Sequence, residues 1–188
     1  LSIILAGYWL QSCQEKPAKV QKNVQYVSGA DEVTYLKLGK EIADTVGIML
    51  KTDLVKAMQE GGPINAVKFC NTNALEITSS YSQKYSTEVK RVSDRNRNEA
   101  NSPNELELEV ISDFNKALAK GEKPSPKVAI DEDGRNNFYA PIITGGACLT
   151  CHGPVESLMP ELTTVIDSLY TEDKAKGYQL NELRGIWS

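Results

Sequence analysis

The sequence has neither a run of about 20 apolar residues nor a long basic stripe, and it contains a single histidine. The first absence leaves no complete transmembrane helix. The second gives no indication of nucleic acid as a partner, and the net charge of -4 agrees with this. With 188 residues, of which 40% are hydrophobic and 24% charged, the chain can bury the core of one globular domain.

The residues with the most distinctive chemistry are Cys148-Leu149-Thr150-Cys151-His152. Two thiols three residues apart can add to the two vinyl groups of one porphyrin, while the adjacent histidine reaches the iron. A redox dithiol and half of a zinc site are the alternatives, because both also use Cys-x-x-Cys. A zinc site usually needs a second pair of ligands, and no strand-then-helix pattern precedes the dithiol. The motif therefore predicts one covalent haem c, attached to Cys148 and Cys151, with His152 as the proximal iron ligand.

The single histidine also limits the sixth iron ligand, because the same chain cannot supply a second one. The remaining choices are Cys70, a methionine, a lysine, a tyrosine or water at an open site. Met49 and Met58 are typical of core filling, and Met159 follows His152 too closely to cross to the other face of the ring. A peroxidase-type enzyme would need a distal histidine for acid-base chemistry, so we expect the protein not to be an enzyme.

The first twelve residues are apolar and lack both an initiator Met and basic residues, which is typical of the end of a signal peptide. Leu10-Gln11-Ser12-Cys13 is similar to a bacterial lipobox, in which the cysteine becomes the lipidated first residue, although Gln is uncommon at its second position. A soluble secreted protein with an incidental Cys13 is the alternative. We expect a signal-peptide remnant at 1–12, a lipid-anchored tether at 13–30 and a haem-binding domain at 31–188. Several acyl chains would hold the domain on the periplasmic side of a bacterial membrane.

Apolar residues recur at three- and four-residue steps from Asp31 to about Gln59, which predicts one long helix or two helices joined near Gly47. Gly61-Gly62-Pro63 ends that pattern and starts a helix over 64–79, whose apolar stripe contains Cys70. The later elements expected are a strand within 85–93, a helix that starts at a Ser102–Glu105 capping box, a β-hairpin over 126–143, a helix over 160–169 and a strand over 184–188. This order predicts an α+β domain built on an antiparallel sheet.

Residues 94–101 form a polar stretch that we expect to be a solvated loop. With a haem nearby, Arg91 or Arg97 could instead pair with a propionate, because a guanidinium group suits bidentate binding of a carboxylate.

Several separated motifs occur in one order along the chain. They are Phe69-Cys70, Arg91-x-Ser93, Arg97-Asn98-x-x-Asn101-x-Pro103, Cys148-x-x-Cys151-His152-Gly153, Tyr170-x-x-Asp173-x-Ala175-x-Gly177-Tyr178 and Arg184-Gly185-Ile186-Trp187-Ser188. From about Leu38 to Ser188 the chain thus resembles a family of bacterial c-type haem-binding proteins and sensor modules, in which Pro often stands at the position of Glu99. The resemblance implies a PAS-like fold, known from a cyanobacterial member, with about five antiparallel strands flanked by helices. It also implies His/Cys ligation, which carries over to His152 and Cys70.

Ligation by a thiolate stabilises ferric iron more than ferrous iron, so we expect a low reduction potential. Reduction should weaken the bond between iron and sulfur, which could open a site for a diatomic gas. We therefore expect a redox- or gas-responsive sensor module that acts through a separate protein. The alternative is a low-potential monohaem c-type cytochrome for periplasmic electron transfer, for which haem alone suffices. The sequence identifies neither the signalling protein nor the redox partner.

Overall fold

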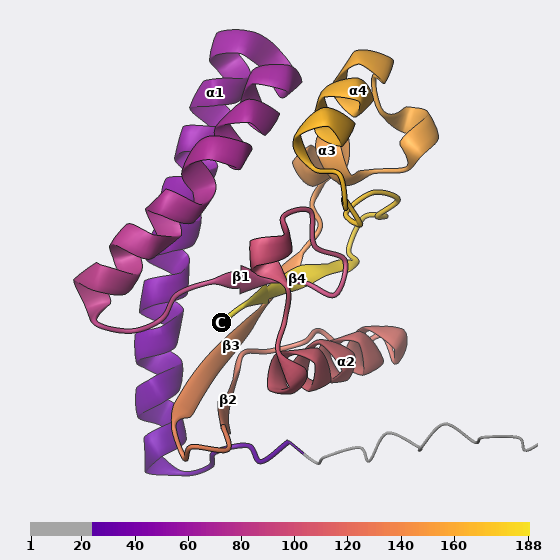
Figure 1. Ribbon diagram of the computed structural model, residues 1–188. Helices are drawn as coiled ribbons and strands as arrows, with labels where there is room; N and C mark the ends of the chain where they lie inside the picture. The colour runs from indigo at the N-terminus through magenta and orange to yellow at the C-terminus, as the bar shows by residue number, and fades with distance from the viewer. Residues whose placement is uncertain (1–23) are drawn as a thin grey trace, which may run out of the picture.

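The structure, a computed structural model, describes residues 24–188, and its first helix is folded into a helical hairpin (Figure 1). Helix α1 runs from Ala30 to Tyr85, but Gly61 and Gly62 leave the helical conformation and divide it into two limbs. Gly62 has a φ of 69°, which residues with a Cβ rarely adopt. Pro63 suits the first turn of the second limb, because the amide hydrogen it lacks would have no partner there. The predicted break is confirmed at the two glycines, whereas Gly47 lies inside an uninterrupted helical stretch.

The two limbs of α1 pack against each other along an apolar seam. Its buried residues are Ile42, Val46 and Leu50 of the first limb, Ala74 of the second, and Val89 beyond the helix. Trp187, near the end of the chain, packs on the same seam. The seam therefore holds the second limb, with Cys70, against the rest of the domain.

Four strands form one antiparallel sheet in the order β1-β4-β3-β2. They are β1 (Arg91–Val92), β2 (Lys127–Ile130), β3 (Asn136–Ile143) and β4 (Leu183–Trp187). The predicted hairpin, the last strand and the α+β class are confirmed. The strand expected within 85–93 has only two residues, because α1 continues to Tyr85 and ends at Ser86 in the left-handed conformation. The sheet thus has four strands instead of about five, with a single bridge from Tyr26 to Ala129 at its edge.

Side chains that alternate along β3 let helices cover both faces of the sheet. Phe138 packs against α1 at Gly39, where an added Cβ would overlap the aromatic ring. Tyr139 belongs instead to the buried cluster of Val110, Ile111 and Phe114 from α2 (Glu105–Ala119). Figure 1 shows the sheet flanked by α1 and α2. The site described below lies where β3 ends, after Ile143, and where β4 begins, at Leu183.

Residues 24–27, which we assigned to the tether, belong to the folded domain. The amide of Val27 donates to the carbonyl of Val128 at 2.9 Å, and the hydroxyl of Tyr26 donates to Asp113 at 2.8 Å. The domain therefore starts near Val24 rather than at residue 31, because these groups extend the edge of the sheet at β2. The expected signal-peptide remnant, Cys13 and the rest of the tether lie outside the described residues. Between residues 24 and 188, no helix is long and apolar enough to cross a membrane.

Helix α2 begins at a different capping box from the one expected at Ser102. The side chain of Asn104 accepts a hydrogen bond from the amide of Glu107 at 2.9 Å, and the Glu107 carboxylate accepts one from the amide of Asn104 at 2.8 Å. Pro103 therefore precedes the helix instead of opening it. Glu107 is 1% exposed and also accepts from the hydroxyl of Ser188 at 2.7 Å, so the box joins α2 to the end of the chain.

We expect Asn104→Ala to lower the free energy of unfolding by about 1 kcal/mol, because the first turn of α2 loses its side-chain acceptor. Urea unfolding followed by circular dichroism measures the change. Asn115→Ala, on the exposed side of the same helix, is the control, and it should have no effect or a slightly stabilising one. Equal losses in the two variants would contradict the role of the cap.

Candidate functional site

The Cys-x-x-Cys-His motif lies on two short helical segments that follow β3. They are the 3-10 helix η2 (Gly146–Cys148) and helix α3 (Leu149–His152). In such segments, residues three and four positions apart face the same side. Cys148 and Cys151 have free thiols and are half-buried. The backbone therefore presents both thiols and His152 on one side, as attachment of one porphyrin requires.

A hydrogen bond orients the ring of His152. Its Nδ1 lies 2.8 Å from the carbonyl oxygen of Ala175, and this oxygen can only accept, so Nδ1 carries the hydrogen. The other nitrogen, Nε2, is then left with a lone pair. Burial lowers the pKa of His152 well below its usual range, and the nearby Arg184 and Arg97 lower it further. The ring is therefore neutral at pH 7 and in the form that binds a metal.

The loop between α4 (Pro160–Leu169) and β4 supports the motif through its backbone. The amide of Tyr178 donates to the carbonyl of His152 at 2.9 Å, and that of Gly177 donates to the carbonyl of Gly153 at 2.8 Å. The rings of His152 and Tyr178 meet edge to face, with 6.3 Å between their centroids. The loop thus fixes the backbone and one side of the ring at the end of the motif.

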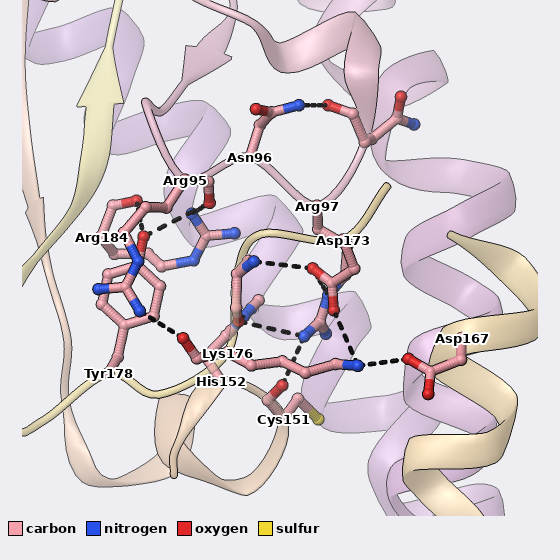
Figure 2. A network of polar contacts seen from close by, with 12 residues as sticks. Arg95, Asn96, Arg97, Cys151, His152, Asp167, Asp173, Lys176, Tyr178 and Arg184 are labelled. Atoms are coloured by element: carbon pink, nitrogen blue, oxygen red, sulfur yellow. Dashed lines mark hydrogen bonds and ion pairs between the residues drawn. The ribbon is translucent and has the colours of Figure 1, made fainter. Parts of the chain in front are cut away.

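A buried ion pair connects the motif to the same loop (Figure 2). Arg97 donates from Nη2 to the carbonyls of Cys151 at 2.7 Å and Ala175 at 3.2 Å, and from Nε to Asp173 at 3.2 Å. The Asp173 carboxylate also accepts from the amide of Ala175 at 2.8 Å. The side chains of Arg97 and Asp173 are 9% and 2% exposed. The carbonyl that orients His152 is therefore held by this ion pair.

The expectation that residues 94–101 form a solvated loop is wrong at its centre. Asn96 and Arg97 are buried, and the carbonyl of Asn96 accepts from the amide of Lys174 at 3.0 Å. The stretch is polar because its side chains and backbone bind another loop instead of water. Of the Arg97 donors, Nε and Nη2 bond to protein atoms, so these two nitrogens are engaged by the protein itself. The propionate contact of Arg97 stays a prediction.

Cys70 lies on the second limb of α1, next to the segment that carries the motif. One turn earlier on the same limb, Val67 packs with Leu162 and Ile166 of α4, and Cys151 packs on that cluster. A charge on Cys70 would raise the pKa of Cys151, which places the two thiols in one electrostatic environment. The structure therefore brings together two of the residues that the sequence singled out.

The surroundings of Cys70 are both apolar and positively charged. Burial raises the pKa of its thiol, while Arg91 and Arg97 lower it in part.

Of the methionines considered as iron ligands, Met49 and Met159 are 40% and 49% exposed. The prediction of Met49 as core filling is therefore wrong, because the packed seam of α1 lies on another side of the helix.

Sequence reasoning did not include Arg184 and Tyr178 among the site residues. The guanidinium of Arg184 lies 5.3 Å from the centroid of the Tyr178 ring, and that of Arg95 lies 3.9 Å from it. A usable signal was present, since Arg184 interrupts an otherwise apolar strand between Leu183 and Gly185. Arginine in such a strand needs a specific partner.

Within residues 24–188, no three His, Cys, Asp or Glu side chains converge as ligands of a metal ion. The described residues do include a histidine whose Nδ1 faces a carbonyl, the two free thiols of the motif and the free thiol of Cys70.

We expect Asp173→Ala to lower the free energy of unfolding by about 3–5 kcal/mol, because Arg97 would stay buried without its carboxylate. Asp167→Ala is the control, since it removes the exposed partner of Lys176 and should cost at most about 1 kcal/mol. Urea unfolding of both variants beside the parent chain measures the difference. Losses of the same size would show that the Arg97–Asp173 pair does not stabilise the site.

Comparison with known proteins agrees with the architecture. The sequence profile of the Tll0287-like family matches residues 11–188, and no curated protein matches the chain. Among solved structures, that of the cyanobacterial heme-protein Tll0287 superposes with a TM-score of 0.60 at 18% identity, covering 85% of this chain and 94% of that one. The likeness confirms the α+β fold with a long N-terminal helix. Since the family profile spans nearly the whole sequence, the chain belongs to the Tll0287-like family.

Proposed function

We propose that the chain binds one haem c covalently through Cys148 and Cys151, with His152 as the proximal and Cys70 as the distal iron ligand. The observation that carries the proposal is the ring of His152. Its Nδ1 is committed to the carbonyl of Ala175, which leaves Nε2 for a metal on a segment with two free thiols. The relative of known structure is itself described as a heme-protein, which supports the proposal.

The residues of the site have distinct tasks in binding. The thiols of Cys148 and Cys151 would form thioether bonds, and the ion pair of Arg97 and Asp173 orients His152 before any cofactor is attached. Bound haem supplies a one-electron redox centre. A thiolate from Cys70 favours the ferric state of that centre, so the potential should be low.

We propose that the module responds to a redox change or to a diatomic gas and passes the response to a separate protein. Its support is the position of Cys70, which lies on the second limb of α1. That limb packs on the first limb and on Trp187 of the sheet, so a change at Cys70 can reach both of them. A low-potential electron carrier is the alternative, and it requires no such coupling.

Export belongs to the same proposal, because bacteria attach haem c outside the cytoplasmic membrane. The domain would lie on the periplasmic side, anchored by lipid at Cys13 or soluble. Neither an enzymatic activity nor a nucleic acid partner is part of the proposal.

Covalent attachment is tested on protein expressed with the cytochrome c maturation machinery. We expect the denatured protein to keep the mass of one haem and to stain for haem on a gel. The Cys148→Ala/Cys151→Ala variant should lose both signals, while Cys13→Ala, the matched control, should keep them. Haem that dissociates from the parent chain on denaturation would contradict thioether bonds.

Axial ligation is tested by absorption and EPR spectra of Cys70→Ala, oxidised and then reduced, with and without carbon monoxide. We expect the low-spin ferric thiolate signature of the parent protein to vanish and the midpoint potential to rise, because the anionic ligand is lost. Met159→Ala, which changes an exposed side chain, should leave the spectra as they are.

The same spectra distinguish the two functions. Carbon monoxide binding to the reduced parent protein supports a ligand-responsive sensor. Unchanged spectra in Cys70→Ala, together with no carbon monoxide binding, would mean that another residue holds the iron in both states, and would favour the electron carrier.

A further inference from the structure

Three guanidinium groups act on His152, but the positive charge there is only partly compensated. They belong to Arg91 of β1, to Arg97 in the loop after β1, and to Arg184 of β4. All three lower the pKa of His152. Asp173 forms an ion pair with Arg97. Across residues 24–188, neither Arg91 nor Arg184 has a carboxylate within ion-pair distance. Two positive charges are therefore left in excess.

Arg91 is the more poorly satisfied of the two. Its Nε is buried and has no hydrogen-bond partner. The closest compensation is the ring of Trp187, whose centroid lies 5.9 Å from the guanidinium carbon. A buried guanidinium nitrogen without a hydrogen-bond partner is unfavourable, so an anionic acceptor would stabilise Arg91.

Arg184 is in a similar position on the side of Tyr178 (Figure 2). Besides facing the aromatic ring, it donates from Nη1 to the carbonyl of Arg95 at 3.4 Å, which is a long hydrogen bond, and it is hydrogen-bonded to the side chain of Tyr178. Burial lowers the pKa of Arg184, and the charges of Arg97 and Arg91 lower it further. The positive charges of these three arginines thus repel each other.

We propose that Arg91 and Arg184 form a carboxylate-binding site that takes the two propionate groups of the haem. The proposal rests on the proposed function and deepens it, because it assigns the part of the site that binds the anionic edge of the cofactor. Two guanidinium groups without a carboxylate partner match two carboxylates in number and charge, and their planar donors suit bidentate binding. Arg97, which the sequence suggested beside Arg91, is replaced in this role by Arg184, since Arg97 is paired with Asp173.

The test uses haem-loaded Arg91→Gln and Arg184→Gln and the propionate-bending bands of the resonance Raman spectrum, which report hydrogen bonds to the propionates. We expect each variant to shift a propionate band relative to the parent protein, and the midpoint potential to fall, because positive charge near the iron is lost. Arg135→Gln is the matched control, since Arg135 lies in the turn between β2 and β3, where its side chain is 72% exposed and pairs with Asp131 at 2.9 Å. It should leave the bands unchanged.

Propionate bands that stay unchanged in both variants would overturn the proposal, and so would an equal shift in the Arg135→Gln control. If a glutamine variant fails to fold, the lysine variants replace it. They keep the charge but lose the bidentate geometry, so a smaller shift is expected and an absent shift counts against the site. Failure of the parent chain to carry covalent haem would contradict the proposed function, and the gel assay reveals that outcome separately.

Discussion

The arrangement of the site depends on the carbonyl oxygen of Ala175. It accepts from Nδ1 of His152 at 2.8 Å and from Arg97 at 3.2 Å, while the amide of the same residue donates to Asp173. This carbonyl thereby selects the tautomer of the imidazole. Residue Ala175 is itself positioned by an ion pair that is nearly inaccessible to water, where electrostatic interactions are strong. Orientation of the ligand is thus a property of the folded chain.

Two parts of the fold meet at this point. The hairpin of α1 contributes Cys70, and β3 leads into the segment that carries Cys148, Cys151 and His152. Packing of Val67 against Leu162 of α4 joins them. An apolar contact, which has no directional requirement, sets the distance between the elements, and hydrogen bonds then set the angles. Residues of the long helix α1 and of the short segment after β3 can therefore lie together in one site.

Charge is distributed unevenly between the site and the rest of the molecule. The chain has a net charge of -4, yet the surroundings of His152 hold more guanidinium groups than carboxylates. Such an excess destabilises the protein without a ligand, and an anionic ligand would relieve it. The positive charge also favours a neutral imidazole, since each arginine lowers the pKa of His152. The arginines would therefore favour a ligand in two ways, by attracting its anionic groups and by keeping the imidazole neutral for binding a metal.

By itself, the sequence determined the elements whose signals are local. The break at Gly61–Gly62, the hairpin of β2 and β3, and the helix Pro160–Leu169 follow from backbone preferences and periodicity, and so does the Cys-x-x-Cys-His segment. Tertiary structure alone decided the partners of Arg97 and Arg184, the start of the domain near Val24 and the two-residue length of β1. These features depend on contacts between residues far apart in the chain, such as Arg97 with Asp173 and Tyr26 with Asp113. A polar stretch has the same composition whether it binds water or another loop, so only the folded chain distinguishes the two.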